Sequence, residues 1–249
     1  MSNNINDIND KINIPPVYVV NFKNEERKKR MLKRFTTLDI IPNFINEVEL
    51  TDPRVSKCSF NNDIKRTWCV MLQHLDCIRD FYNNTNEKYC IVCEDDIHIS
   101  KNFCKDLPNI ICNFNNLNLD VLMLGYLLSY KIQNESKNHK HYFPIIKNKD
   151  IIVRHDYHKY PDDIWGTQMY LITRKYANFL LDKFTPEFAF NNIDNINYNP
   201  DWIITKNGNR ALIVPMVAVE EGINISDCYN QNIFHKKCYD LNYDEKLYI

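Results

Sequence analysis

The sequence predicts an α/β domain in which a mostly parallel sheet is flanked by helices. Three observations lead to this fold class. Short runs of β-branched and aromatic residues alternate with segments of helical periodicity. The first such run is followed directly by the start of a helix, as in the first half of a βαβ unit. The length of 249 residues and the 44% of hydrophobic residues suit one large domain with a sizeable core.

The elements begin after a polar segment, residues 1–14, which we expect to be a flexible arm. Residues 15–249 are predicted to form one α/β domain. Its first strand is predicted at 17–22, where the run Val-Tyr-Val-Val-Asn-Phe suits a strand buried on both faces. The first helix follows at 23–38, with its apolar residues at helical spacing.

The later elements alternate in the same way. They are a weak strand at 44–48, a helix at 64–82, a buried strand from 88 to the acids at 94–96, a strand at 120–124, a strand at 166–173, a helix at 174–184, a helical segment from 199 and a strand at 211–215. Residues 131–163 are polar, rich in His and Lys and broken by prolines. We predict a long loop or lid there, because loops of this length in compact domains are usually functional or mobile.

Charge and cysteine content limit the classes of protein. The formal net charge is -1, so the chain lacks the basic field typical of nucleic-acid binders. No window of eighteen apolar residues predicts a membrane span, and the N-terminus lacks the apolar region of a secretory signal. The nine cysteines show no regular framework, and Cys90 and Cys93 are expected to diverge within one strand as buried thiols. These features favour a reducing, cytoplasmic location.

Three consecutive acids, Glu94, Asp95 and Asp96, follow the most strongly predicted strand. Adjacent carboxylates repel one another, and a buried strand before them increases the cost of desolvation. A Mn²⁺ or Mg²⁺ ion at the carboxyl end of the strand would relieve both costs and would neutralise a diphosphate leaving group. The alternative is a solvated acidic turn after an ordinary strand.

The start of the first helix offers a complementary anion site. Asn21 ends the first strand, where a base and ribose could bind, and Arg27 lies in the first turns of the helix. Free backbone N–H groups at a helix start favour anions, so Arg27 could grip a phosphate. The alternative is that Arg27 belongs to a solvated basic helix face together with its neighbours.

The order of these motifs resembles that of glycosyltransferase family 25, which contains lipooligosaccharide sugar transferases and collagen galactosyltransferases. The matching segments span roughly residues 16–228. They are the opening strand with Asn21, Glu26 and Arg27; Cys69 and His74 in the second long helix; Glu94-Asp95-Asp96-Ile97; Gly166-Thr167 with Tyr170-Leu171-Ile172 and Ala177; Pro200-Asp201; and Ser226-Asp227. The chain departs from the family pattern at Trp68, Gln73 and Met169.

The resemblance implies a Rossmann-like GT-A fold and a metal-dependent, inverting transfer of a hexose from a UDP-sugar. By analogy, Asp96 and Glu94 would bind the metal, and Asp95 would help to hold the donor. Val19, Asn21, Arg27, Gly166 and Thr167 would complete the donor site. The acceptor would be a hydroxyl of a glycan or of a hydroxylated protein side chain.

Four side-chain roles remain open in the sequence. The base that deprotonates the acceptor is predicted to be Asp201, which could equally be a helix N-cap, with Asp163 as its competitor. His235 is a candidate late metal ligand, although it could also be solvated beside two lysines. His74 could serve the site or be a core histidine, and Trp165 could stack on a sugar or belong to the rim of the core.

Two other functions remain as alternatives. One is an inactive relative that binds a nucleotide-sugar or a glycan, although the acidic triplet is intact. The other is a metal-dependent nucleotidyl- or phosphotransferase. That class would call for a glycine-rich phosphate loop, whereas the four glycines of this chain are isolated.

Overall fold

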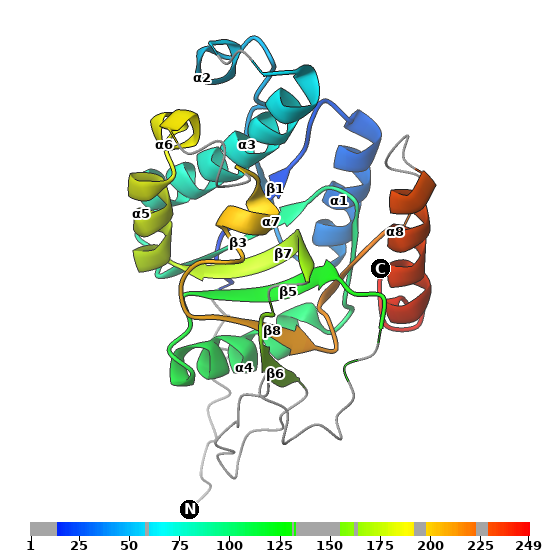
Figure 1. Cartoon of the computed structure of the whole chain (residues 1–249). Coiled ribbons are helices and arrows are strands. Elements are labelled where there is room, and N and C mark those ends of the chain that lie inside the picture. Colours follow the sequence, from blue (N-terminus) through cyan, green and yellow to red (C-terminus); the bar gives the residue numbers. More distant parts are fainter. Residues whose placement is uncertain are drawn as a thin grey trace, which may run out of the picture.

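A seven-stranded sheet forms the centre of the computed structural model, which describes residues 14–57, 60–130, 132, 155–161, 164–191, 198–222 and 229–249 (Figure 1). The strand order is β2-β1-β3-β7-β5-β8-β6. The strands are β1 (Val17–Val20), β2 (Asn43–Phe44), β3 (Tyr89–Glu94), β5 (Val121–Leu127), β6 (Asp156–Lys159), β7 (Trp165–Thr173) and β8 (Arg210–Val214). A separate pair joins β4 (Ile97–Ile99) to β9 (Ala218–Glu220).

Most strands of the sheet run in one direction. β1 is parallel to β2 and β3, and β5 is parallel to β8. Only β7 and β6 are reversed within this sheet, since β7 pairs antiparallel with both β3 and β5, and β6 pairs antiparallel with β8. The predicted α/β class with a mostly parallel sheet is therefore confirmed, and the carboxyl ends of β1, β3, β5 and β8 meet at one edge.

Helices cover both faces of the sheet (Figure 1). The helices are α1 (Glu25–Thr37), α2 (Pro53–Ser56), α3 (Asn62–Asn84), α4 (Phe103–Asn116), α5 (Arg174–Lys183), α6 (Pro186–Asn191), α7 (Pro200–Ile203) and α8 (Tyr229–Asn242). One core contains apolar residues of α3, α5 and α7, and the other contains residues of α1 and α4. None of the described helices is long and apolar enough to cross a membrane.

The buried strands supply side chains to both cores in turn. In β3, Cys90 and Val92 belong to the core under α3, whereas Ile91 and Cys93 belong to the core under α1 and α4. Successive side chains of a strand point to opposite faces, so a strand covered on both sides is apolar without interruption. Cys90 and Cys93 thus diverge as predicted, and all seven cysteines of the described residues are free thiols.

Several elements differ from the sequence predictions. The predicted loop at 131–163 is wrong at its end, because β6 lies there as an edge strand. Of the other residues from 131 to 163, the structure describes only Ile132, His155, Tyr160 and Pro161. The helix α4, which contains Pro108, and the elements β4, β9 and α8 were not predicted. The predicted arm also falls outside the described residues up to position 13.

Candidate active site

The acidic triplet lies at the carboxyl end of β3, between the ends of β1 and β7. Glu94 is the last residue of the strand, and Asp95 and Asp96 form the turn into β4. Both aspartates are 7% exposed, so the alternative of a solvated acidic turn is wrong. The chain has placed three carboxylates where water is largely excluded, and each needs a compensating partner.

Arg27 supplies one such partner. Its Nη1 atom donates to Asp95 Oδ1 at 3.0 Å and lies 3.1 Å from Asp96 Oδ2. The helix carrying it is capped by Asn24, whose side chain accepts from the backbone N–H of Arg27 at 3.0 Å. The alternative of a solvated Arg27 is therefore wrong, since its guanidinium is turned inward to the acids.

Asn21 fixes the other side of Asp95. Its Nδ2 atom donates to Asp95 Oδ2 at 2.5 Å and to the carbonyl of Asn24 at 3.0 Å. Its own carbonyl accepts from Nε2 of the buried Gln73 at 2.8 Å. Gln73, one of the residues at which the chain departs from the family pattern, thus holds the end of β1 by a hydrogen bond. Val19 lies two residues earlier with its side chain fully buried in the core, so only its backbone can face a ligand.

A second group of residues joins Glu94 to Asp201 through Thr167. The Thr167 hydroxyl lies 2.9 Å from Glu94 Oε1 and 3.1 Å from Asp201 Oδ1. One hydroxyl proton can serve only one of these carboxylates at a time. The arrangement favours a protonated carboxyl on one side. Burial raises the pKa of Asp201, although the Thr167 hydrogen bond opposes that shift.

Two local features place this second group. Gly166 has a φ of +107°, and a Cβ there would lie 2.0 Å from Oε1 of Gln168, so this position requires glycine. At α7, the N-cap is Asn199, whose side chain accepts from the backbone N–H of Trp202 at 2.8 Å. Asp201 is therefore not the cap, and its carboxylate faces Thr167 instead. Asp163, its competitor, lies outside the described residues.

Glu220 and Glu221 complete the acidic edge, and the sequence analysis missed both. The pairing of β4 with β9 sets Glu220 opposite Ile97, and the backbone N–H of Glu221 donates to the carbonyl of Asp96 at 2.7 Å. A buried Val-Ala-Val run before two acids repeats the pattern that marked the first acidic motif, and this signal could have found them.

The two late glutamates have different partners. Glu221 accepts from Arg30 at 2.9 Å and from Arg34 at 2.7 Å; its burial would raise its pKa, but these arginines hold the pKa below its usual value. Glu220 Oε2 lies 2.7 Å from Nδ1 of His235. His235 is thus half-buried at the acidic edge, and the alternative of a solvated histidine beside lysines is wrong.

The electrostatics of the edge are dominated by burial. Burial, followed by the charges of Asp96 and Asp201, raises the pKa of Glu94 well above its usual range. Burial and the charge of Glu220 raise the pKa of Asp96 to about 7, against the opposing effect of Arg27. Burial would lower the pKa of His235, but the hydrogen bond and charge of Glu220 outweigh it and raise the pKa.

Two oxygens at this edge lack the partners that burial demands. Asp96 Oδ1 and Glu220 Oε1 are buried without a hydrogen-bond partner among the described residues. Carboxylate oxygens of this kind suit a hard divalent cation. Within the same described part of the chain, no group of three or more His, Cys, Asp or Glu side chains is arranged to hold a metal alone. A metal here would therefore need ligands from a substrate as well, which is the usual way of binding Mg²⁺.

A small polar cavity of about 180 Å³ lies beside this edge. Its lining comes from the ends of β1 and β2 and the start of α1, including Asn21, Lys28 and Phe44. The Lys28 amine lies 5.3 Å from the centre of the Phe44 ring. A flat aromatic face beside hydrogen-bonding groups is suited to a nucleotide base.

The structure shows the surroundings of His74 and Trp165, two of the side chains whose roles the sequence left open. His74 is fully buried, its Nδ1 lies 3.0 Å from the Tyr170 hydroxyl, and burial lowers its pKa to about 3. It is a neutral core histidine. Trp165 is 37% exposed at the start of β7, with its ring 5.7 Å from that of Trp202. Trp202 directly follows Asp201 in α7.

The fold and this edge define an α/β protein with a polar, acidic ligand site at the carboxyl ends of its parallel strands. The model of glycosyltransferase family 25, described as an LPS biosynthesis protein family, matches residues 69–196. This match covers slightly more than half of the chain, and the chain therefore belongs to glycosyltransferase family 25. It is a glycosyltransferase, an enzyme that moves a sugar from a donor to an acceptor.

Other comparisons add little. No curated protein matches the chain. A solved structure titled "Crystal Structure of A197 from STIV" is similar over 80% of this chain and 81% of its own, with 13% sequence identity and a TM-score of 0.41. A likeness this weak carries no functional argument.

Proposed function

We propose that the chain is a metal-dependent, inverting hexosyltransferase that uses a UDP-sugar donor and a hydroxyl acceptor on a glycan or a protein. The observation that carries this proposal is the pair of buried, unpartnered oxygens of Asp96 and Glu220 beside the Arg27 guanidinium. Such an edge holds uncompensated negative charge next to a phosphate-binding cation, which suits a metal–diphosphate pair.

Asp96 and Glu220 would hold the metal, and His235 would orient Glu220 by its hydrogen bond. When bound, Mn²⁺ or Mg²⁺ would supply charge neutralisation for the diphosphate leaving group. Arg27 would exchange part of its contact with Asp95 for the diphosphate, because a guanidinium suits both anions. The base of the nucleotide would lie in the small cavity at Asn21 and Phe44.

Asp201 is our candidate for the base that accepts the proton of the acceptor hydroxyl. Its buried carboxylate is held by Thr167 and lies apart from the Arg27 contacts, and its raised pKa makes it a stronger base. A single carboxylate that deprotonates the acceptor is the requirement of a direct displacement with inversion. The anomeric configuration of the product, read by NMR, tests that outcome.

The first experiment is calorimetric titration of UDP in the presence of Mn²⁺, Mg²⁺ or a chelator. We expect binding to wild type only with a divalent metal and its loss in Asp96→Asn. The matched control is Asp63→Asn, because the Asp63 side chain is 86% exposed at the start of α3. Metal-independent binding, or retention of metal-dependent binding in Asp96→Asn, would remove Asp96 from the metal site.

A second experiment separates the base from the donor site. After a screen of UDP-hexoses for hydrolysis, transfer is compared in Asp201→Asn and Asp163→Asn. We expect Asp201→Asn to lower the transfer rate at least a hundredfold while UDP affinity is preserved, as for loss of a general base, which contributes about 10²–10⁴-fold. The same pattern in Asp163→Asn alone would assign the base to Asp163.

A further inference from the structure

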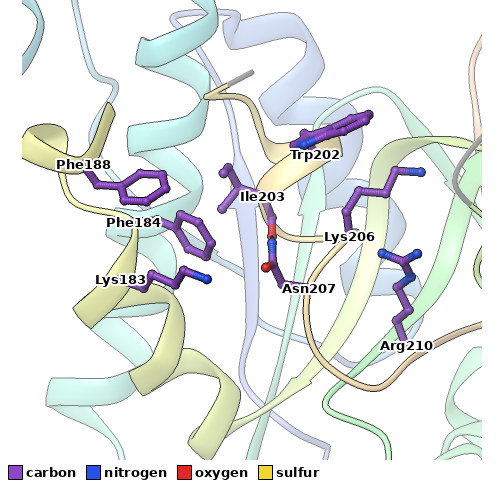
Figure 2. Close-up of a pocket in the computed structure, with 8 residues that line it drawn as sticks. All are labelled: Lys183, Phe184, Phe188, Trp202, Ile203, Lys206, Asn207 and Arg210. Atoms are coloured by element: carbon purple, nitrogen blue, oxygen red, sulfur yellow. Dashed lines mark hydrogen bonds between the residues drawn. The ribbon is translucent and has the colours of Figure 1, made fainter. Parts of the chain in front are cut away.

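A groove of about 580 Å³ lies between the ends of α5 and α6 on one side and α7 and the start of β8 on the other (Figure 2). Its volume falls within the range of small-molecule sites, about 300–1,000 Å³. The groove is lined by Lys183, Phe184, Phe188, Trp202, Ile203, Lys206, Asn207 and Arg210. None of these residues was assigned a role in donor or metal binding.

The groove adjoins the candidate base. Trp202 directly follows Asp201 in α7, and Lys206 lies one helical turn further on. Burial dominates the pKa of Asp201 and raises it, whereas the Lys206 charge acts on the same carboxylate and lowers it. Trp165, at 5.7 Å from Trp202, continues the wall toward Gly166 and Thr167. The groove and the candidate base thus share the helix α7.

Three cations and three aromatic rings form the walls, and the described lining residues include no carboxylate. The Lys183 amine lies 5.1 Å from the centre of the Phe184 ring. The Lys206 amine donates to the carbonyls of Pro161 and Ile164, and Arg210 donates to that of Tyr160, contacts that fix both side chains. Figure 2 shows the Lys183 and Arg210 heads on opposite sides of the groove.

We propose that this groove binds the acceptor, and that the acceptor is an anionic saccharide bearing carboxylate or phosphate groups. The apolar faces of the sugar rings pack against the aromatic rings of Trp202 and Phe184. The anionic substituent lies near Lys183, an exposed cation on the side of the groove opposite Trp202 and Arg210 (Figure 2). The proposal rests on the proposed function, since it takes Asp201 as the base.

The test is binding of three related sugars to the full chain, measured by calorimetry without donor or metal. The probes are lactose, 3′-sialyllactose, which carries a carboxylate, and lactose 6-phosphate. We expect at least one charged probe to bind about tenfold more tightly than lactose and to lose that advantage at high salt. Preference for one charged probe over the other identifies the anionic group.

Variants locate the binding. Lys183→Glu reverses an exposed charge in the groove and is expected to weaken the charged probe about tenfold, with no effect on lactose. Lys175→Glu is the matched control, since this exposed lysine lies at the other end of α5. Trp202→Ala is expected to weaken binding of all three probes, and Lys183→Gln, which removes the charge without reversing it, is expected to give a smaller effect than Lys183→Glu.

The proposal is overturned if lactose and the charged probes bind equally, if Lys175→Glu matches Lys183→Glu, or if UDP displaces the charged probe, which would make the groove a nucleotide site. UDP binding with metal is measured separately on the same variants. Loss of the sugar result with intact UDP binding contradicts the groove alone, whereas absence of UDP binding with intact sugar binding contradicts the proposed donor and leaves the groove supported.

Discussion

Asp96 is predicted to lower the stability of the ligand-free protein, so Asp96→Asn should raise it. The pKa of Asp96 in the folded chain is about 7, above its ordinary value of 3.8. A raised folded-state pKa means that the stabilising contribution is full below the unfolded value and is lost as pH rises through the folded value. Above pH 7 the folded protein therefore holds an ionised carboxylate at a net cost.

The size of this cost follows from the two pKa values. They differ by roughly three pH units, and each unit corresponds to about 1.36 kcal/mol, which gives an upper value of about 4 kcal/mol. Asparagine keeps an oxygen that can accept from Arg27 and carries no charge. We expect a gain of about 2–4 kcal/mol at pH 8, or a rise in Tm of roughly 4–16 °C for a chain of this size.

The assay is thermal unfolding in the presence of a chelator at pH 8 and pH 5.5. The gain should shrink by about 2 kcal/mol at pH 5.5, where Asp96 is already mostly protonated in the folded wild type. Asp95→Asn is the matched control, because both oxygens of Asp95 accept hydrogen bonds, from Arg27 and Asn21. The free energy of unfolding of this control should fall by about 1–3 kcal/mol. An Asp96→Asn protein less stable than wild type at pH 8, or a gain independent of pH, would refute the reasoning.

Three further substitutions test the site and its supports. Thr167→Val removes a hydrogen bond that lowers the pKa of Asp201, so the acidic limb of the pH profile of transfer should move to higher pH; an unchanged limb argues against Asp201 as the base. Gly166→Ala puts a Cβ on a residue with a φ of +107° and 2.9 Å from the backbone nitrogen of Leu127, so it should cost about 1–3 kcal/mol in chemical denaturation, and an unaltered midpoint contradicts this. His74→Leu replaces a neutral core histidine and should leave UDP affinity within about twofold, whereas a tenfold loss would give His74 a role in the site.

The sequence predicted the elements whose patterns are local. The runs in β1 and β3 are apolar without interruption because both faces are buried, and the helix α3 shows its apolar stripe clearly. The edge strand β6 was missed because its segment, Asp-Tyr-His-Lys, pairs on one side only and carries polar residues. The helix α4 was not predicted because Pro108 lies inside it, and proline is uncommon in the interior of helices.

The site was predictable only as far as its residues lie within motifs. Asn21, Arg27 and the acidic triplet were expected near one another, because parallel strands end at the same edge. The pairing of Ile97 with Glu220 joins segments far apart in sequence, and no local pattern encodes it. The apolar run before Glu220 could have marked this residue as a second acidic motif, but its place beside Asp96 and its contact with His235 emerge only from the fold.

The raised pKa of Asp96 makes a last prediction about ligand binding itself. A cation at this carboxylate favours its ionised form, so binding must release the proton that Asp96 holds. With a pKa of about 7, roughly three quarters of Asp96 is protonated at pH 6.5 and almost none at pH 8.5. Titration of the preformed Mn²⁺–UDP complex, in buffers of different ionisation enthalpy, should therefore show release of about 0.7 proton at pH 6.5 and little at pH 8.5. Because Glu94 also has a raised pKa, a release above one proton would mean that both carboxyls ionise together. Binding without proton release at pH 6.5 would mean that the cation does not reach Asp96, and would place the metal elsewhere on the edge.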